Sequence, residues 1–303
     1  MADLPAVSVV IPVYNAEGFI GTTLESVFSQ TFSDYEVIAA DDGSTDRSVS
    51  IIQEAAKRHG KDVTILHQNR EKSPAARNLG ASHARGRYLA FLDADDLWHP
   101  DNLRRQVSLL ESEPETVMVW CDWDVINDQE QVIRRGLDKH AMHCPDASPL
   151  TQLLGADVRS LHLSGVLIRR DDFFRSGGFD TKTFPVEDYD FAFRMKQYGR
   201  VRFHEDVLLT YRHHGKGISK NSILQLEGHW TLLQKLESHY LGDARKIRLV
   251  HRLMADVRSN QGWNEIKDGR SKDGRRLIRE AIEYNPAKFR TYSRLVRSYI
   301  PWL

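Results

Sequence analysis

The sequence predicts an α/β fold, with a mostly parallel sheet flanked by helices and a helical C-terminal region. Three observations support this. The run Val7–Val13 is almost continuously β-branched, which is typical of a strand buried on both faces of a parallel sheet. Short apolar segments then alternate with amphipathic helical segments, as in βαβ units. From residue 221 onward only helical periodicity remains.

The first 123 residues predict five strands with four helices between them. The expected strands are Val7–Val13, Glu36–Ala40, Val63–Leu66, Tyr88–Leu92 and Val117–Trp120. The expected helices are Phe19–Gln30, Asp46–His59, Pro74–His83 and Asp101–Ser112. Strands that alternate with helices in this way favour a parallel sheet with its connections crossing over both faces.

The rest of the chain divides near residue 220. Before that point we expect strands at Gln131–Arg135, Ser164–Ile168 and within Val201–Tyr211, and helices at Asp171–Ser176 and Asp188–Tyr198. After it we expect the helices Ser222–Leu241, Asp243–Asp268, Lys272–Tyr284 and Ala287–Tyr299. The predicted domains are therefore residues 1–220 and the helical region 221–303.

The charges are balanced overall but not along the chain. There are 42 basic and 42 acidic residues, yet residues 244–303 hold 15 Lys or Arg and 6 Asp or Glu, a net charge of +9. Such an asymmetry predicts either contact with an anionic partner or a solvated helical surface. The chain has only two cysteines, no signal-peptide pattern and no stretch of 18 apolar residues, so we expect a cytoplasmic protein without a spanning helix.

Acidic residues gather where the expected strands end. Asp41, Asp42 and Asp46 follow the second strand, and Asp93, Asp95 and Asp96 follow the fourth. Ligands of open α/β sheets bind beyond the carboxyl ends of the strands. Each cluster alone is equally typical of a turn or a helix cap. Both together, beside the turn after Val13, favour a binding crevice.

A crevice lined by carboxylates needs cations to offset their mutual repulsion. Oxygen ligands of this kind suit Mn2+ or Mg2+, which are typically held by few protein ligands together with substrate phosphates. Neither a G-x-x-x-x-G-K-[ST] loop nor a G-x-G-x-x-G turn follows a strand, so P-loop and dinucleotide sites are not indicated. His140, His143 and Cys144 lack the paired spacing of a zinc site.

An ordered set of short motifs carries a resemblance to a known family. The motifs are Val9-Val10-Ile11-Pro12-Val13-Tyr14-Asn15, Asp41 to Asp46, Ala76-Arg77-Asn78-Leu79-Gly80, Phe91-Leu92-Asp93-Ala94-Asp95-Asp96, Gly177-Gly178-Phe179-Asp180, Glu187-Asp188 and Tyr211-Arg212-His213-His214. Through this ordered set of motifs, the chain resembles a family 2 glycosyltransferase of the GT-A fold. Residues 1–220 would then be the nucleotide-sugar-binding and catalytic domain.

The resemblance implies roles for individual residues. Pro12, Tyr14, Asn15, Asp41, Asp42, Arg77 and Asp93 would line the donor site, with Asp41 near the base. Asp93 and Asp95 would form the D-x-D motif, and Asp95 with His214 would lie at the metal, Mn2+ or Mg2+. Asp188 would be the catalytic base. Local sequence alone fits other roles, since a Glu-Asp pair also suits a helix N-terminus and a lone histidine is more often an ordinary surface or packed residue.

The sequence departs from the family at one place. The family often has a Gly four residues before the Ala-Arg-Asn motif, where this chain has Lys72. Lys72 could add a cation near the donor diphosphate, or it could belong to a charged surface turn. Both interpretations stay open at the level of sequence.

The implied reaction is an inverting transfer of a sugar from a nucleoside diphosphate, UDP by family resemblance, onto an acceptor hydroxyl. Alternatives are a sugar nucleotidyltransferase, which would need a Gly- and Arg-rich phosphate loop near the N-terminus, and an inactive nucleotide- or glycan-binding scaffold. Trp120, Trp123, Ser164 and Phe184 could line the acceptor site, although such aromatics are more often core.

The partners follow from the same resemblance and from the charge pattern. We expect a nucleotide-sugar donor and a glycan or lipid-linked glycan acceptor, in cell-surface glycan synthesis, and no nucleic acid. Arg residues and aromatics alternate with aliphatics over residues 289–303. This pattern predicts peripheral contact with the inner face of a membrane through the basic C-terminal helices, or packing against protein.

Overall fold

The computed structural model describes residues 4–127, 129–136, 161–214 and 221–299. The chain forms two compact units. The first comprises Met1–Cys144, Asp157–Thr181 and Asp188–Gly217, and the second comprises Pro145–Ala156, Lys182–Glu187 and Ile218–Leu303. His140, His143 and Cys144, for which the sequence predicts no zinc site, lie outside the described residues.

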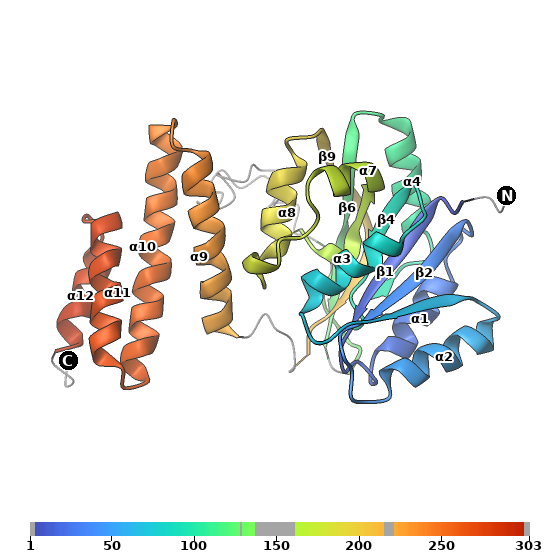
Figure 1. Ribbon diagram of the computed structural model, residues 1–303, viewed down its shortest axis with the longest axis horizontal. Coiled ribbons are helices and arrows are strands. Elements are labelled where there is room, and N and C mark those ends of the chain that lie inside the picture. The colour runs from blue at the N-terminus through green and yellow to red at the C-terminus, as the bar shows by residue number, and fades with distance from the viewer. Residues whose placement is uncertain (1–3, 128, 137–160, 215–220, 300–303) are drawn as a thin grey trace. The chain divides into compact units, whose positions relative to one another are not determined.

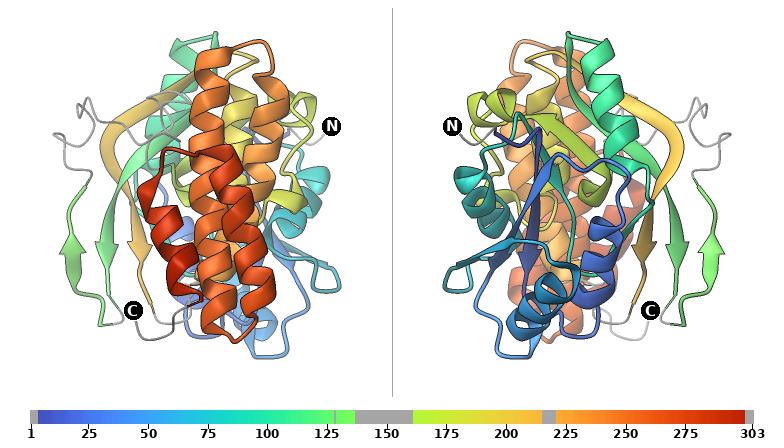
Figure 2. Two further views of the ribbon diagram at one scale, coloured as in Figure 1. Left: turned by 90° about the vertical axis from the view of Figure 1, so that its left-hand side faces the viewer. Right: turned by 90° about the vertical axis from the view of Figure 1, so that its right-hand side faces the viewer.

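The first unit is built on a mixed sheet. Its nine described strands are β1 (Val7–Val13), β2 (Tyr35–Asp41), β3 (Val63–His67), β4 (Tyr88–Phe91), β5 (Leu97–Trp98), β6 (Thr116–Ile126), β7 (Val132–Arg134), β8 (Val166–Arg169) and β9 (Arg200–Arg212). They lie in the order β3-β2-β1-β4-β8-β6-β9-β5, with β7 beside β6 at the outer edge (Figure 2). The part β3-β2-β1-β4 is parallel, as predicted, whereas β8 runs antiparallel to both of its neighbours.

Helices cover both faces of the sheet (Figure 1). The described helices of this unit are α1 (Ile20–Phe28), α2 (Ser48–His59), α3 (Ser73–His83), α4 (Asn102–Ser112), α7 (Arg170–Arg175) and α8 (Glu187–Met195). Side chains alternate along β1: Val9 and Ile11 belong to one buried cluster with Leu24 of α1, whereas Val10 faces α3, where a Cβ on Gly80 would lie 2.4 Å from its Cγ1. This alternation is the reason why a continuous apolar run forms a strand buried on both faces.

The described residues of the second unit form four helices, whose ends lie within two residues of the predicted bounds. They are α9 (Ser222–His239), α10 (Ala244–Lys267), α11 (Ser271–Tyr284) and α12 (Phe289–Arg297). Helices α10 and α11 approach each other closely at Gly262 and Gly274, where a Cβ on either would meet the carbonyl oxygen of the other at 2.5–2.6 Å. No helix in the described part of the chain combines the length and apolar character that a membrane crossing requires.

Candidate active site

The parallel strands β1, β2 and β4 bring their carboxyl ends to one edge of the sheet. In the register, Val13 lies beside Asp41 and Val10 beside Phe91. The loop after β1 is tied to the loop after β2 by Asn15, whose backbone N–H donates to Ser44 Oγ at 3.1 Å and whose Oδ1 accepts the Thr45 N–H at 2.8 Å. Asn15 has a φ of 46°, a conformation that Asn tolerates better than most residues.

Pro12 is buried at the end of β1 and Tyr14 is half-buried just beyond it. Asp41, at the end of β2, is 3% exposed. Its Oδ1 accepts the Ser44 N–H at 3.2 Å, and its Oδ2 lies 3.1 Å from Nδ1 of the exposed His67. Asp41 therefore lies at the carboxyl end of β2, and a neighbouring imidazole that the sequence did not indicate shares its carboxylate.

Asp42 is 4% exposed, and its carboxylate is engaged by the protein itself. Oδ1 accepts hydrogen bonds from Gln68 Nε2 at 2.7 Å and from the Glu71 N–H at 2.6 Å. Oδ2 accepts the Lys72 N–H at 2.8 Å. Asp42 thus holds residues 68–72, which we call the basic loop, against the end of β2.

Arg77 connects the helix after the basic loop to the D-x-D motif. Its side chain is 4% exposed, and Nη2 donates to Asp93 Oδ1 at 2.5 Å. The guanidinium also lies over the ring of Phe179, 5.7 Å from its centroid. The structure therefore brings Arg77 and Asp93, two residues predicted to line the donor site, into direct contact.

Asp95 and His214 are the second predicted pair that the fold brings together. His214 Nε2 lies 2.9 Å from Asp95 Oδ2, although 119 residues separate the two in sequence. The imidazole of His214, which is 8% exposed, is stacked on Phe19 with ring centroids 4.8 Å apart. No sequence signal pointed to Phe19, because an aromatic residue before a helix is usual for core packing.

Asp96 lies beneath the surface next to Asp93 and Asp95 and is linked to both through Ser164 and Arg212. It is fully buried; its Oδ2 accepts the Ser164 hydroxyl at 2.5 Å, and its Oδ1 accepts the Arg212 N–H at 3.0 Å. Burial raises the pKa of Asp96 well above its ordinary value, and the nearby charges of Asp95 and Asp93 add to the effect. The Ser164 oxygen in turn accepts the Asp93 N–H at 3.1 Å, so one buried network fixes the backbone of the motif.

His162 lies beside this network and was not predicted. Its Nδ1 is 3.6 Å from Asp96 Oδ2, and burial lowers its pKa. Its ring contacts Trp123 and Tyr211, with centroids 5.9 and 4.7 Å away. Of the residues considered for the acceptor side, Ser164 serves the network described above, and Trp120 is 2% exposed and packs on Phe203, so both belong to the interior.

Asp188 is the second residue of helix α8, and its Oδ1 accepts the Tyr189 N–H at 2.8 Å. The segment before the helix is fastened to α3 by Asn78, which exchanges two hydrogen bonds with the backbone of Phe179 at 2.8 and 2.9 Å. Arg194 of α8 donates to the carbonyl oxygen of Gly178 at 2.7 Å. The Ala-Arg-Asn and Gly-Gly-Phe-Asp motifs are therefore joined by contacts that position the helix of Asp188.

The residues at the D-x-D motif fit a divalent cation of the Mn2+ or Mg2+ type. Asp95 supplies a carboxylate oxygen and His214 an imidazole nitrogen, and the Asp95 side chain is 34% exposed. Over the ranges that the structure describes, no group of three or more His, Cys, Asp or Glu side chains is placed to hold a metal. Mg2+ is usually bound through one or two carboxylates together with substrate phosphates and water, so few protein ligands can suffice.

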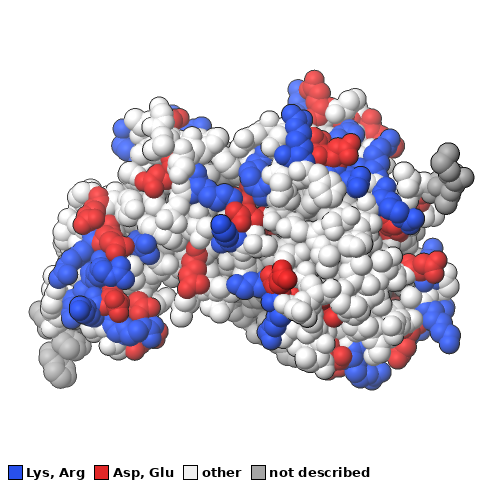
Figure 3. All heavy atoms as spheres, viewed as in Figure 1, with Lys and Arg blue, Asp and Glu red and all other residues white. Residues whose placement is uncertain are grey.

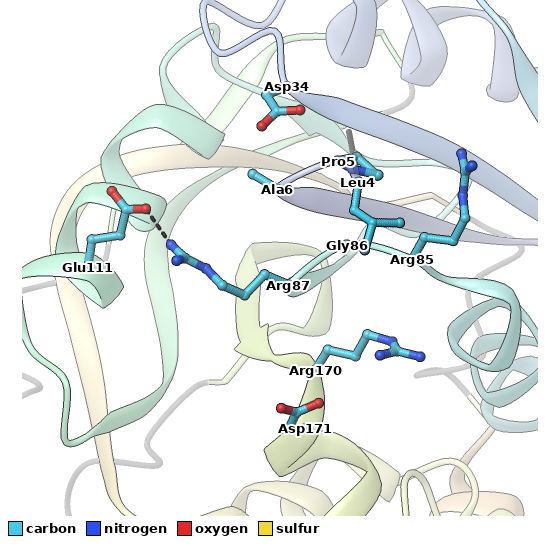
Figure 4. Close-up of a pocket in the computed structure, with 10 residues that line it drawn as sticks. All are labelled: Leu4, Pro5, Ala6, Asp34, Arg85, Gly86, Arg87, Glu111, Arg170 and Asp171. Atoms are coloured by element: carbon cyan, nitrogen blue, oxygen red, sulfur yellow. Dashed lines mark hydrogen bonds and ion pairs between the residues drawn. The ribbon is translucent and has the colours of Figure 1, made fainter. Parts of the chain in front are cut away.

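A cavity of about 510 Å3 opens at the opposite edge of the sheet (Figure 4). It is lined by the residues before β1 and before β4, including Ala6 and Arg87, and Arg87 donates to Glu111 at 2.5 Å. Three arginines there face three carboxylates, so the lining carries no net charge. The cavity therefore lies at the amino ends of β1 and β4, away from the strand ends that carry Asp42 and Asp93.

The comparisons with known proteins agree with the motifs. The family model described as glycosyl transferase family 2 matches residues 8–174, more than half of the chain. The chain belongs to glycosyl transferase family 2. An uncharacterized glycosyltransferase of Rickettsia prowazekii (strain Madrid E) is 25% identical over 267 residues, which cover 84% of this chain and 79% of the relative.

Two solved structures have the same fold. TarS 1–349 of S. aureus in complex with UDP-GlcNAc aligns with a TM-score of 0.69 at 16% identity, over 97% of this chain and 89% of that chain. The mannosyltransferase PcManGT of Pyrobaculum calidifontis, in complex with GDP-Man and Mn2+, aligns with a TM-score of 0.60 at 20% identity, over 99% and 88% of the two chains. The predicted family and the predicted GT-A fold are thereby confirmed.

Proposed function

We propose that this family 2 member transfers a sugar, with inversion, from a UDP-sugar to an acceptor hydroxyl, and that it does so in cell-surface glycan synthesis. The observation that carries the proposal is the meeting of two pairs, Arg77 with Asp93 and Asp95 with His214, at one edge of the sheet. The choice of UDP rests on the TarS complex with UDP-GlcNAc, whose fold this chain shares.

In this proposal the donor lies over the ends of β1, β2 and β4. Pro12, Tyr14, Asn15 and Asp41 line the side of the base, and Asp42 acts on the donor through the loop that it holds. Arg77 and Asp93 lie on the side of the ribose and diphosphate. The catalytic domain is then residues 1–220, with 221–303 as a helical appendage.

Asp95 and His214 would hold Mn2+ or Mg2+, which when bound stabilises the negative charge that develops on the leaving nucleoside diphosphate. Asp188 takes the proton from the acceptor hydroxyl as that oxygen attacks the anomeric carbon. An alcohol is a poor nucleophile until a base removes its proton, and a positioned carboxylate accelerates such a step by about 10²–10⁴-fold.

The test replaces Asp188 by Asn and measures turnover and the donor KM. We expect turnover to fall by about 10²–10⁴-fold while the donor KM stays within about twofold, because only the proton acceptor is lost. The matched control is Asp171→Asn, which removes a carboxylate from the first turn of another helix, α7. If Asp188→Asn kept wild-type turnover, Asp188 would not be the base.

We also propose that the helical region meets an anionic membrane surface or a lipid-linked acceptor. The support is a row of exposed side chains on and just after α12, namely Phe289, Tyr292, Val296 and Tyr299, which are 82, 40, 51 and 55% exposed. Arginines flank this row. Over the face drawn in Figure 3, acidic side chains lie among the basic ones of this unit, so on that face they would offset part of the attraction to an anionic surface.

Removing residues 286–303 tests this contact by co-sedimentation with phosphatidylglycerol vesicles. We expect the full chain to sediment with the vesicles and the shortened chain to stay in solution. The double variant Phe289→Ser, Val296→Ser keeps the chain length and should behave like the shortened chain. Equal sedimentation of all three proteins would contradict the membrane contact.

A further inference from the structure

The basic loop, residues 68–72, carries two non-glycine residues in the left-handed half of backbone space. Arg70 has a φ of 43°, and Lys72 has a φ of 75° with a ψ of 165°. The second combination belongs to a region that is populated almost only by glycine, because a Cβ clashes with the backbone there. Lys72 therefore carries a conformational cost that a glycine at the same position would not have.

Contacts place this loop at the predicted donor site. The guanidinium of Arg70 lies over the ring of Tyr14, 4.2 Å from its centroid, at the end of β1. The carboxylate of Asp42 accepts the Lys72 N–H at 2.8 Å, at the end of β2. Lys72 is also the residue before α3, the helix that carries Arg77 to Asp93. The basic loop thus contacts the carboxyl ends of both β1 and β2. It is followed directly by α3, which carries Arg77 on the proposed diphosphate side of the donor site.

The electrostatics of this edge leave a need for another cation. Asp41, Asp42, Asp93 and Asp95 all lie at the strand ends, and a nucleoside diphosphate adds further negative charge. The guanidinium of Arg77 is already paired with Asp93 at 2.5 Å. A charged surface turn would explain why position 72 is exposed, but it would not explain a lysine where the backbone geometry favours glycine.

We propose that Lys72 binds the diphosphate of the donor through its ammonium group, and that this contact is the reason for a lysine at a glycine-type position. The inference rests on the proposed function, because it assumes a nucleoside diphosphate at this edge. Lys72 is then a donor-binding residue that the charge at the site makes necessary, and the strain at its backbone is the cost of placing it there.

The test compares four purified variants, Lys72→Met, Lys72→Arg, Lys72→Gly and, as the matched control, Lys57→Met on the exposed side of α2. Affinities are measured for UDP, GDP, TDP and CDP with Mn2+ on the wild type. The nucleotide that binds is then compared with its own nucleoside, which lacks the diphosphate, on every variant.

We expect Lys72→Met to weaken binding of the nucleoside diphosphate by about tenfold or more and to leave the affinity for the nucleoside unchanged, since a charge-assisted contact is lost. Lys72→Arg should recover most of the affinity, and Lys57→Met should match the wild type. Lys72→Gly should raise the melting temperature by relieving the strain and yet bind the diphosphate as weakly as Lys72→Met.

Two results would count against different claims. A wild type that binds none of the four diphosphates would overturn the proposed function itself. If the wild type binds one of them, and Lys72→Met and Lys72→Gly bind it as tightly as the wild type does, only the role of Lys72 would be overturned. Lys72 would then belong to a charged surface turn.

Discussion

Replacing Asp42 by Ala tests how the basic loop is held. The substitution removes an acceptor of three hydrogen bonds, from Gln68 Nε2, the Glu71 N–H and the Lys72 N–H. Hydrogen bonds to a charged group contribute about 1.5–3 kcal/mol each, but Glu71 and Lys72 are exposed, so water replaces part of what is lost. We take the total loss as about 3–5 kcal/mol on this basis.

The loss is offset because the freed loop no longer has to keep Lys72 in a glycine-type conformation, which costs about 1–3 kcal/mol. The expected net destabilisation of Asp42→Ala is therefore about 0–4 kcal/mol, centred on about 2 kcal/mol. Urea unfolding measures it, and a nucleotide titration measures the accompanying loss of donor affinity, which we expect to be about tenfold because the loop is no longer preorganised. Asp42→Asn keeps one acceptor oxygen and should lie between Ala and the wild type.

A double-mutant cycle decides whether the reasoning is right. Lys72→Gly should stabilise the wild type and have a much smaller effect in the Asp42→Ala background, because without Asp42 there is no strain to relieve. If Lys72→Gly stabilised both backgrounds equally, the hydrogen bonds of Asp42 would not be what holds Lys72 in its conformation.

Two further predictions concern stability. Burial alone would raise the pKa of Glu36, but hydrogen bonds from Ser8 and Arg85 outweigh it and lower the pKa below its ordinary value of 4.5. The wild type should therefore be more stable than Glu36→Gln at neutral pH, and urea unfolding at several pH values should show the difference fading as the pH falls through the lowered pKa; a difference that did not change with pH would contradict this. Gly86→Ala would place a Cβ 2.6 Å from the Ser8 nitrogen and should destabilise the protein by about 1–3 kcal/mol, whereas Gly18→Ala, with nothing within 4 Å, should have little effect; equal melting temperatures for the two would be the contrary result.

The parallel half of the sheet could be predicted because local sequence determines it directly. The run Val7–Val13 is apolar on both faces and matches β1 residue for residue. The antiparallel strand β8 and the two-residue strand β5 (Leu97–Trp98) could not be assigned to their neighbours, because their pairing depends on contacts with residues far along the chain. Helix α2 begins at Ser48 and not at Asp46, since Asp46 instead accepts the Ser48 N–H at 2.9 Å from outside the helix.

For the candidate site, the sequence indicated which positions would lie near one another but not which contacts they would make. Motif order placed Asp95 and His214 in one site, and the fold brings their side chains to 2.9 Å. The sequence did not reveal that Asp42 holds a loop, because a carboxylate after a strand looks the same whether it meets a ligand or backbone amides. His162 carried no signal at all. The departure at Lys72 was visible in the sequence with two open interpretations, and the backbone angles and contacts of the basic loop favour the one in which Lys72 meets the diphosphate.

The most direct measurement is the shift in thermal stability that UDP causes, with Mn2+ and with EDTA, in the wild type and in Asp95→Ala. At a nucleotide concentration of about 100 times Kd, binding should add roughly 2.7 kcal/mol to the free energy of unfolding. We predict this stabilisation for the wild type with Mn2+, and its loss both in EDTA and in Asp95→Ala. The same stabilisation in all three cases would contradict the metal at Asp95 and His214, and no stabilisation by UDP, GDP, TDP or CDP would contradict a donor site at this edge of the sheet.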